Sequence, residues 1–572
     1  MADGSGSIRE SKVEAVKRES RGLRGALHEG LMDSQAAAFD EDGYNLLKFH
    51  GIYQGYDRDS ATELKQQGLD KAHQFMARVR IPGGRLTAAQ YLALDGLADD
   101  YADGTLRITT RQSIQYHGVV KHNLKATIAG INAALLTTIA ACGDVVRTVT
   151  TVPAPIRDAV HRRLEADARA LSEHLLPTTH AYHEIWLDGE RIEGAAEPEP
   201  LYGETYLPRK FKIGLAVPDD NSVDVLTNDL GIVALFDESR QRLLGYNFAL
   251  GGGLGINHNN AKTYPRLATP VAFVEPGDLL AAAAAVVKLH RDYGDRANRK
   301  HARLKYVIAE NGEAWAKARL EEYLGKSLEA PRPHAPFRVA DHLGWHGQGD
   351  GLFYLGLPVP SGRIVDGPEA GRLRTAVRAI VERFGAAPVL TPTQDILLSD
   401  IAAADRDAVD ALLAEHGVAA AERLTPVRRW ALACPALPTC GLALTEAERV
   451  REPMLDAIEA ALGRHGLRDE TFSIRITGCP NGCARPYAGD VGIVGRIPGF
   501  YSLYVGGDFE GTRLNVKLLD KVGEGAVAAT LEPLFALFAA DRRPEERFGD
   551  FCHRVGPDRL LTAIGQSRKE AV

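Results

Sequence analysis

Four cysteines lie within fifty residues, in the segments Cys434-Pro-Ala-Leu-Pro-Thr-Cys440 and Cys479-Pro-Asn-Gly-Cys483. Thiolates gathered in fours hold either a zinc ion or an iron–sulfur cluster. Both pairs are spaced more loosely than most zinc knuckles, and prolines and Gly482 give their loops fixed or unusual backbone angles. The pattern favours loops wrapped around a bulky inorganic cluster. A zinc site, two disulfides and four buried apolar cysteines are the alternatives.

The composition is typical of a globular enzyme with several domains. At roughly 150 residues per domain, 572 residues predict three to four domains. The net charge of -7 and the pI near 6.2 argue against a general nucleic-acid binder. No run of about 18 apolar residues predicts a membrane span, and the N-terminal residues lack the apolar core of a signal peptide. Because four of only six cysteines belong to the two pairs, we expect a reducing cytoplasm rather than a disulfide scaffold.

Apolar and polar residues alternate from Thr105 to Gly118, which predicts one β-strand. Residues two apart in a strand share a face. One face would therefore carry a polar stripe made of Arg107, Thr109, Arg111, Ser113, Gln115 and His117. Two guanidinium groups at this spacing suit a ligand with several carboxylates. We interpret the stripe as a polyanion-binding face, and a solvated sheet face is the alternative.

Part of this stretch is repeated later in the chain. Residues 357–365 echo residues 80–87, a helix is expected after each, and residues 388–397 echo residues 106–115. The second copy has Val389 in place of Arg107 and Thr393 in place of Arg111. A charge that the fold itself required should occur in both copies. We therefore predict that the first copy binds the ligand and that the second is its structural counterpart.

A second repeat relates residues 210–253 to residues 473–507. Lys210 and Lys212 occur only in its first copy, and the paired cysteines only in its second. The chain then has the order A–B–A′–B′, with a pseudo-twofold axis and a cofactor between the halves. We predict a surface arm, either solvated or docked to a partner, and four segments, with the boundaries 1–65 (arm), 66–140 (A), 141–335 (B), 336–420 (A′) and 421–572 (B′).

Two further segments carry weaker signals. The basic run from Asp295 to Lys305 is expected to be a solvated helix face, with contact to an anionic cofactor as the alternative. The glycine-rich stretch from Gly251 to Gly255 is interpreted as a tight turn, because the helix and acidic residue of a nucleotide-binding fingerprint do not follow it. No flavin motif is recognisable, so a redox role would need electrons from another protein.

The cysteine segments, C-P-A-L-P-T-C-G-L-A-L-T-E-A-E-R and R-I-T-G-C-P-N-G-C-A-R, resemble those of the sirohaem and [4Fe–4S] sulfite and nitrite reductases. Further segments, L-L-K-F-H-G, R-I-P-G-G, Y-L-P-R-K-F-K and K-T-Y-P-R among them, are most similar to the assimilatory sulfite reductase haemoproteins, and the similarity runs from about residue 20 to residue 555. The resemblance implies an α/β (α+β) fold of two ferredoxin-like half-domains plus two sirohaem- and cluster-binding domains. It implies the six-electron reduction of sulfite to sulfide at a sirohaem coupled to a [4Fe–4S] cluster.

The resemblance also implies roles for individual residues. The cluster ligands would be Cys434, Cys440, Cys479 and Cys483, and Cys483 would also bridge the cluster to the sirohaem iron. The residues that hold sirohaem would be Arg107, Thr109, Arg111, Gln115, His117 and Asn481. The residues that bind sulfite and deliver protons would be Arg78, Arg147, Lys210 and Lys212.

The same resemblance predicts an electron-donor protein as partner, either a flavoprotein reductase component or a ferredoxin, and it requires neither nucleic acid nor membrane. A sirohaem-dependent nitrite reductase, which would produce ammonia, is an alternative of the same class. A zinc-structured binding protein is an alternative of another class. Cys142, near Arg147, is expected to be a small buried residue or else a redox-active one.

Overall fold

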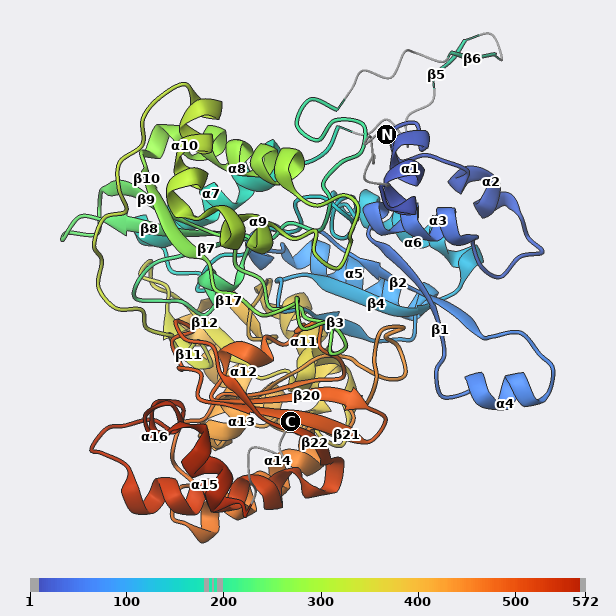
Figure 1. The fold of residues 1–572 in the computed structure, drawn as a ribbon. Helices are drawn as coiled ribbons and strands as arrows, with labels where there is room; N and C mark the ends of the chain where they lie inside the picture. Colours follow the sequence, from blue (N-terminus) through green and yellow to red (C-terminus); the bar gives the residue numbers. More distant parts are fainter. Residues whose placement is uncertain (1–9, 179–184, 188–189, 193–198, 566–572) are drawn as a thin grey trace, which may run out of the picture.

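The computed structural model describes residues 10–178, 185–187, 190–192 and 199–565, so residues 1–9 of the predicted arm lie outside it. Four β-sheets of four or five strands, with helices packed around them, form the body of the molecule (Figure 1). Within the described ranges, no helix is both long and apolar enough to cross a lipid bilayer. The sheets fall into two repeated halves, which confirms the predicted α/β (α+β) architecture; the five segment boundaries stay a prediction.

Each ferredoxin-like half-domain contains an antiparallel sheet and two helices. The strand order is β1-β2-β4-β3-β13 in the first copy and β11-β12-β17-β16 in the second. The strands are β1 (Ile52–Tyr56), β2 (His73–Arg78), β3 (Leu106–Ile108), β4 (Ile114–Val119), β11 (Gly344–Gly347), β12 (Leu352–Leu357), β13 (Arg363–Ile364), β16 (Ala387–Leu390) and β17 (Ile396–Ala402). The helices are α5 (Ala88–Tyr101), α6 (Leu124–Ala133), α11 (Leu373–Phe384) and α12 (Arg406–Glu415), and α4 (Ala61–Gln66) lies between β1 and β2.

Helix α5 begins where the sequence predicts it. Thr87 caps the helix, because its hydroxyl accepts a hydrogen bond from the Gln90 N–H at 3.1 Å. The Gln90 side chain accepts one from the Thr87 N–H at 3.1 Å in return. This reciprocal pair satisfies backbone donors that the first turn of a helix leaves free.

The prediction of one strand from Thr105 to Gly118 is wrong, because this segment is the hairpin of β3 and β4. Gln112 has a left-handed φ of 52°. The Thr109 hydroxyl accepts hydrogen bonds from the backbone N–H groups of Arg111 and Ser113, and these contacts reverse the chain. The shared face survives in part, because β3 and β4 pair with Arg107 directly opposite Gln115.

The two larger domains also repeat each other, as Figure 1 shows at the upper left and at the bottom. In each, a parallel pair of strands continues into antiparallel ones, β7-β8-β9-β10 in the first and β19-β20-β21-β22 in the second. An aspartate occupies the same place in both. Asp229 accepts from the Lys212 N–H at 2.9 Å, and Asp490 accepts from the Ser473 N–H at 2.8 Å. The shared topology confirms the order A–B–A′–B′.

The elements of the larger domains have the following bounds. The first contains β7 (Ile213–Ala216), β8 (Leu230–Phe236), β9 (Leu243–Leu250), β10 (Thr269–Val274), α7 (Ala159–His174), α8 (Leu279–Tyr293), α9 (Leu304–Asn311) and α10 (Glu313–Leu324). The second contains β18 (Leu432–Ala433), β19 (Ile474–Thr477), β20 (Val491–Ile497), β21 (Phe500–Val505), β22 (Val516–Gly523), α13 (Pro426–Trp430), α14 (Arg451–Arg464), α15 (Val527–Asp541) and α16 (Phe548–Ala563).

The two half-domains exchange contacts across the pseudo-twofold axis. Strand β13 of the second copy pairs with β3 of the first. The Gln112 side chain donates to the Leu390 carbonyl at 3.0 Å, and the Gln394 side chain donates to the Ile108 carbonyl at 3.5 Å. Beside these contacts, a Cβ at Gly84 or at Gly362 would lie 2.3 Å from a carbonyl oxygen of the other copy. The closest approach of the halves therefore depends on glycine at both positions.

The N-terminal arm is packed on the body, so the expectation of a solvated arm is wrong for α1 (Lys12–Glu19), whereas docking to a partner stays a prediction. Its Glu14 is buried and pairs with Arg296 at 2.5 Å. In the same basic run, Arg299 pairs with Asp144 at 2.8 Å, so the run is not a solvated helix face either. Glu14 of the arm and Arg296 of the basic run thus neutralise each other. The remaining helices of the arm are α2 (Leu27–Met32) and α3 (Glu41–Leu47).

Gly362→Ala should destabilise the protein by about 3 kcal/mol, because the new Cβ would meet the Ile108 carbonyl and the φ of 75° disfavours an L side chain. Gly385→Ala is the matched control. Its φ is 65°, but nothing lies within 4 Å of the added Cβ, so a loss of about 1 kcal/mol is expected. Urea unfolding of the two variants measures the difference. Equal losses would contradict the close approach of the half-domains.

Candidate functional site

The four predicted cluster ligands follow two neighbouring strands of the last domain. Cys434 follows β18, and Cys479 follows β19, which pairs with β18 in parallel. Cys434 and Cys479 are buried, Cys440 is half-buried and Cys483 is exposed. Burial, followed by the other three thiols, raises the pKa of Cys434. Thiols that influence one another's ionisation lie close together, and all four are free, so the two-disulfide alternative is wrong.

N–H groups point at two of these thiols. The Gly478 N–H donates to the Cys434 Sγ at 3.3 Å, and the Asn481 amide donates to the Cys479 Sγ at 3.4 Å. Such contacts favour the thiolate and tune the potential of a cluster. Among the residues that the structure describes, no three His, Cys, Asp or Glu side chains lie close enough together to hold one metal ion. A cubane does not need so tight a set, because its irons and sulfides separate the thiolates.

A second group of side chains, which we call the cation cluster, consists of Arg78, Arg111, Arg147, Lys210 and Lys212. Burial and then Lys212 and Arg147 lower the pKa of Lys210 well below its usual range. Burial and then Arg111 and Arg303 lower the pKa of Lys212 to about 7. The Cys483 carbonyl accepts from the hydroxyl of Thr110, the residue before Arg111, at 2.9 Å, which places Cys483 close to the cation cluster. The structure therefore brings both predicted sets of residues to one place.

Backbone carbonyls, rather than carboxylates, hold the guanidinium groups of the cation cluster. Arg147 donates to the Gly143 carbonyl at 3.1 Å. Arg111 donates to the Thr148 and Ile213 carbonyls at 2.6 and 2.7 Å, and its Nε has no partner within the described residues. Over the same residues, no member of the cluster forms an ion pair with Asp or Glu. The positive charge of this group is thus not neutralised by the protein.

Arg78 lies at the end of β2 and faces two partners. Its Nη1 donates to the Cys142 Sγ at 3.0 Å. With the Gln115 amide oxygen turned toward it, its Nε donates to that oxygen at 3.1 Å. Cys142 is fully buried, which agrees with the expectation of a small buried residue. Gln115 therefore orients a member of the cation cluster.

The other residues predicted to hold sirohaem also have protein partners. Arg107 donates to the carbonyl of Ala433, the residue before Cys434, at 3.0 Å. His117 lies 3.0 Å from Arg363 of the second copy, and burial followed by Arg363 lowers its pKa well below the usual range. The Thr109 hydroxyl closes the β3–β4 turn and the Asn481 amide faces a thiol, as described above. For Arg107, Thr109, Arg111, Gln115, His117 and Asn481, contact with sirohaem stays a prediction.

Three residues that sequence reasoning missed also shape the site. The Thr110 hydroxyl donates to the Cys483 carbonyl at 2.9 Å. Arg303 pairs with Asp229 at 2.8 Å, and Asp229 accepts from the N–H of Lys212. One signal was available, because Asp229 and Asp490 occupy the same position in the two copies of the second repeat. Arg303 belongs to the basic run from Asp295 to Lys305, but nothing in that run marks its pairing with Asp229, and nothing local marks Thr110.

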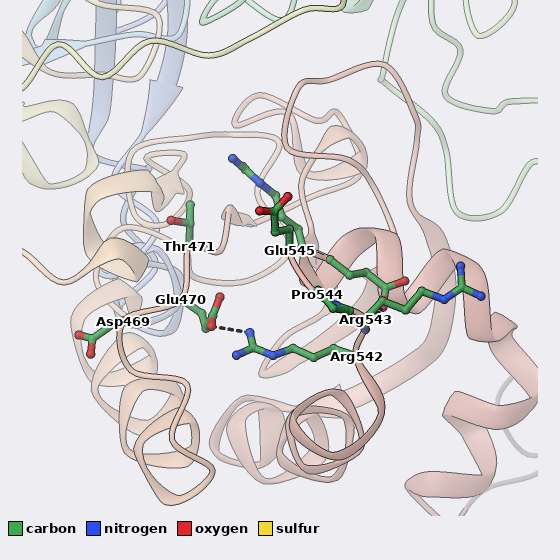
Figure 2. A pocket seen from close by; sticks show the side chains of 9 residues that line it. Asp469, Glu470, Thr471, Arg542, Arg543, Pro544 and Glu545 are labelled. Atoms are coloured by element: carbon green, nitrogen blue, oxygen red, sulfur yellow. Dashed lines mark hydrogen bonds and ion pairs between the residues drawn. The ribbon is translucent and has the colours of Figure 1, made fainter.

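A large surface cavity lies elsewhere. It has a volume of about 470 Å³ and is lined by residues 469–471 and 542–547. Figure 2 shows its mixed charges, with Arg542 and Glu470 paired across it. None of the predicted site residues lines it, so we do not assign the chemistry to this cavity.

The side chains at the site fit the two cofactors that the resemblance implies. Five uncompensated cations match a macrocycle that carries many carboxylates, because buried positive charge is stable only when an anion accompanies it. The partnerless Nε of Arg111 is a further donor available to such a ligand. Four free thiols match a cluster with four cysteine ligands. Cys483 is linked to the cation cluster through Thr110, the residue before Arg111, whose hydroxyl donates to the Cys483 carbonyl.

Comparisons with known proteins agree with this assignment. Residues 166–328 and 426–571 match the nitrite and sulphite reductase 4Fe-4S domain, and residues 66–134 and 346–416 match the nitrite/sulfite reductase ferredoxin-like half domain. The chain is 48% identical over 546 residues to the sulfite reductase (NADPH) hemoprotein beta-component of Myxococcus xanthus, with 96% of each chain covered. It is 47% identical to the protein of the same name from Xanthomonas oryzae pv. oryzae, with 95% of this chain and 96% of the relative covered.

A solved structure, that of the Mycobacterium tuberculosis NirA protein, has the same fold with a TM-score of 0.78 and 25% identity, and it covers 97% of this chain and 98% of that chain. The two family models together match well over half of the chain, and they match both copies of each repeat. This chain belongs to the nitrite and sulphite reductase family.

Proposed function

We propose that this protein is an assimilatory sulfite reductase haemoprotein that reduces sulfite to sulfide with six electrons. The observation that carries the proposal is the cation cluster beside exposed Cys483, whose carbonyl accepts from Thr110, the residue before Arg111. It offers a dianion a place to bind at the edge of the cofactor site. The identity of nearly 50% with relatives named sulfite reductase supports sulfite over nitrite as substrate.

The cofactors and the protein have different roles in the proposed reaction. Cys434, Cys440, Cys479 and Cys483 would hold a [4Fe–4S] cluster, which together with sirohaem would relay electrons and supply the iron at which sulfite is reduced. The protein orients the substrate and supplies protons. Arg78 and Arg147 offer fixed, always protonated forks to the oxygens of sulfite.

Lys210 and Lys212 are suited to proton delivery. Each oxygen that leaves the substrate as water must be protonated. Because burial and neighbouring cations lower the pKa of both lysines, each gives up a proton more readily than a surface lysine does. Arg303 and Asp229 hold the backbone of Lys212 in place.

The electrons must come from a partner protein. The relatives are named as the beta-component of an NADPH enzyme, which favours a flavoprotein reductase component over a ferredoxin as the donor. We further propose that the protein acts in the cytoplasm, since buried thiols that are all free fit a reducing compartment.

The proposed activity predicts a coloured protein with Soret and red-region absorption and with stoichiometric labile sulfide. With reduced methyl viologen as donor, the turnover of sulfite at saturation should be at least comparable to that of nitrite. A rate per active site that is far lower for sulfite would favour the nitrite reductase alternative. Full zinc occupancy without iron would contradict both the sulfite reductase proposal and the nitrite reductase alternative.

Cys483→Ala should abolish stoichiometric labile sulfide, because the variant lacks one of the four thiolates that would hold the cluster. Cys552→Ala is the matched control, since Cys552 is a buried free cysteine of the same domain that packs in its apolar core. Iron, labile sulfide and absorption spectra of the two variants measure the outcome. Unchanged sulfide content and spectrum in Cys483→Ala would contradict the ligand assignment.

Lys212→Met should stabilise the cofactor-free protein at pH 7 and lower sulfite turnover of the loaded enzyme by about 100-fold. The folded pKa of about 7 is below the ordinary value of 10.5, so the unfolded chain binds more protons between these values. The stability of the unaltered cofactor-free protein should therefore rise between pH 7 and pH 10.5. Above pH 10.5 the variant should no longer be more stable than the unaltered protein.

The matched control for this experiment is Lys262→Met, at an exposed position, which should change stability by no more than about 0.5 kcal/mol. Urea unfolding at pH 7 and above pH 10.5 measures the stabilities. If Lys212→Met were no more stable than the unaltered protein at pH 7, the charge of Lys212 would not destabilise the cofactor-free protein, and the prediction would be wrong.

A further inference from the structure

The segment that follows Cys483 is fastened to three other domains. The Cys483 carbonyl accepts from Thr110 of the first half-domain at 2.9 Å. Two residues later, the buried Arg485 donates to the Ser222 carbonyl of the first large domain at 3.1 Å. It also donates to the Pro392 carbonyl of the second half-domain at 2.9 Å. Residues 483–485 thus contact every other domain of the molecule.

A buried ion-pair triad completes this junction. Asp224 lies 2.6 Å from Arg475 and 3.1 Å from Arg485. Arg475 also donates to the Arg485 carbonyl at 3.2 Å, so both the side chain and the backbone of Arg485 are held. The three side chains line a cavity of about 20 Å³, which has room for about one water molecule. Bulk water does not screen the triad, and its attraction is correspondingly strong.

The pseudo-twofold axis explains why these residues meet. Asp224 and Arg485 have left-handed φ angles of 48° and 57°, and each directly precedes an equivalent short turn, Val225–Thr227 or Pro486–Ala488. Thr110 and Pro392 occupy equivalent positions in the hairpin turns of the two half-domains. The same structural positions therefore supply a carboxylate and a guanidinium, or a hydroxyl donor and a carbonyl acceptor. The two halves thus bring equivalent positions together at the junction, and different residues at those positions make its two sides complementary.

A left-handed backbone is unfavourable for a residue with a Cβ, so Arg485 needs its partners to keep it there. If they were lost, the turn after Cys483 could relax. Cys483 would then leave its place beside the cation cluster, because only Ala484 separates it from Arg485. The orientation of the exposed thiol thus depends on contacts made by its neighbours and not on the thiol itself.

We propose that Arg485, held by Asp224, and Thr110 are positioning residues that fix the Cys483 thiol in the orientation needed to join the cluster to the sirohaem. The proposal rests on the proposed function and adds to it a clamp in which every domain takes part. Neither side chain touches substrate. Their effect is on the coupling between the two centres.

Arg485→Lys and Thr110→Val test the clamp in the holoenzyme. Lysine keeps the charge but cannot reach the Ser222 and Pro392 carbonyls together, and valine keeps the shape of threonine without its hydroxyl. Both variants should retain full iron and labile sulfide. The absorption and electron paramagnetic resonance signals of the coupled centres should shift, and kcat should fall by about tenfold while KM for sulfite stays within about twofold.

Two further variants sharpen the result. Thr110→Ser keeps the hydroxyl and should restore the signals that Thr110→Val alters. Arg464→Lys is the matched control, because Arg464 is an exposed arginine of the same domain whose ion pair with Glu532 lies on the surface. It should change neither spectra nor kcat.

Unaltered spectra and kcat in both Arg485→Lys and Thr110→Val would overturn the proposal, and so would equal effects of Thr110→Ser and Thr110→Val. If Arg485→Lys does not fold, the comparison of the two Thr110 variants decides alone. An unaltered protein without sirohaem and cluster signals would instead overturn the proposed function, so the two failures are distinguishable.

Discussion

The protein gathers positive charge that it does not itself neutralise, and the rest of the structure is arranged to tolerate this. Buried cations repel one another and lose the hydration they had in water. The depressed pKa values of Lys210 and Lys212 express that cost. Carbonyl groups of the loops around Arg111 and Arg147 offset part of it without cancelling the charge. Such a group of buried cations is stable only when an anion accompanies it. The group therefore indicates that the site binds an anionic cofactor and an anionic substrate.

The two halves share one repeated scaffold, and the residues that differ between them provide the chemistry of the site. The clearest case is the aspartate that both large domains keep at the start of the parallel strand pair. In the first copy, Asp229 pairs with Arg303 and accepts from the N–H of Lys212, the residue before β7. In the second, Asp490 accepts from the Ser473 N–H and hydroxyl, and burial raises its pKa. The same position thus holds a lysine just before β7 in one half and a serine just before β19 in the other.

The four thiols and the repeated order of the domains could be predicted from the sequence, because residue type or self-similarity marks them, whereas Arg78 and Arg147 of the cation cluster were reached only through the family resemblance. The hairpin of β3 and β4 was missed because Thr109 to Gln112 contains neither Gly nor Pro, and because the alternation continues across the turn. The second copy held the missing signal, since Pro392 stands at the equivalent place. The packing of α1 was missed for another reason. Glu14 and Arg296 are separated by most of the first half of the chain, and no local pattern links them.

A site on a pseudo-twofold axis has a physical consequence for how it can evolve. A contact on the axis itself, such as that of Asp224 with Arg485, joins two equivalent positions, so a single substitution changes one side only. Where Asp224 faces Arg485, two like residues would place either two carboxylates or two guanidinium groups in a buried junction with room for one water molecule. Complementary charges therefore could not arise while the halves were identical. The asymmetry that separates a half rich in cations from a half rich in thiols is required at the axis itself, and it extends outward from there to Lys212 on one side and Cys483 on the other.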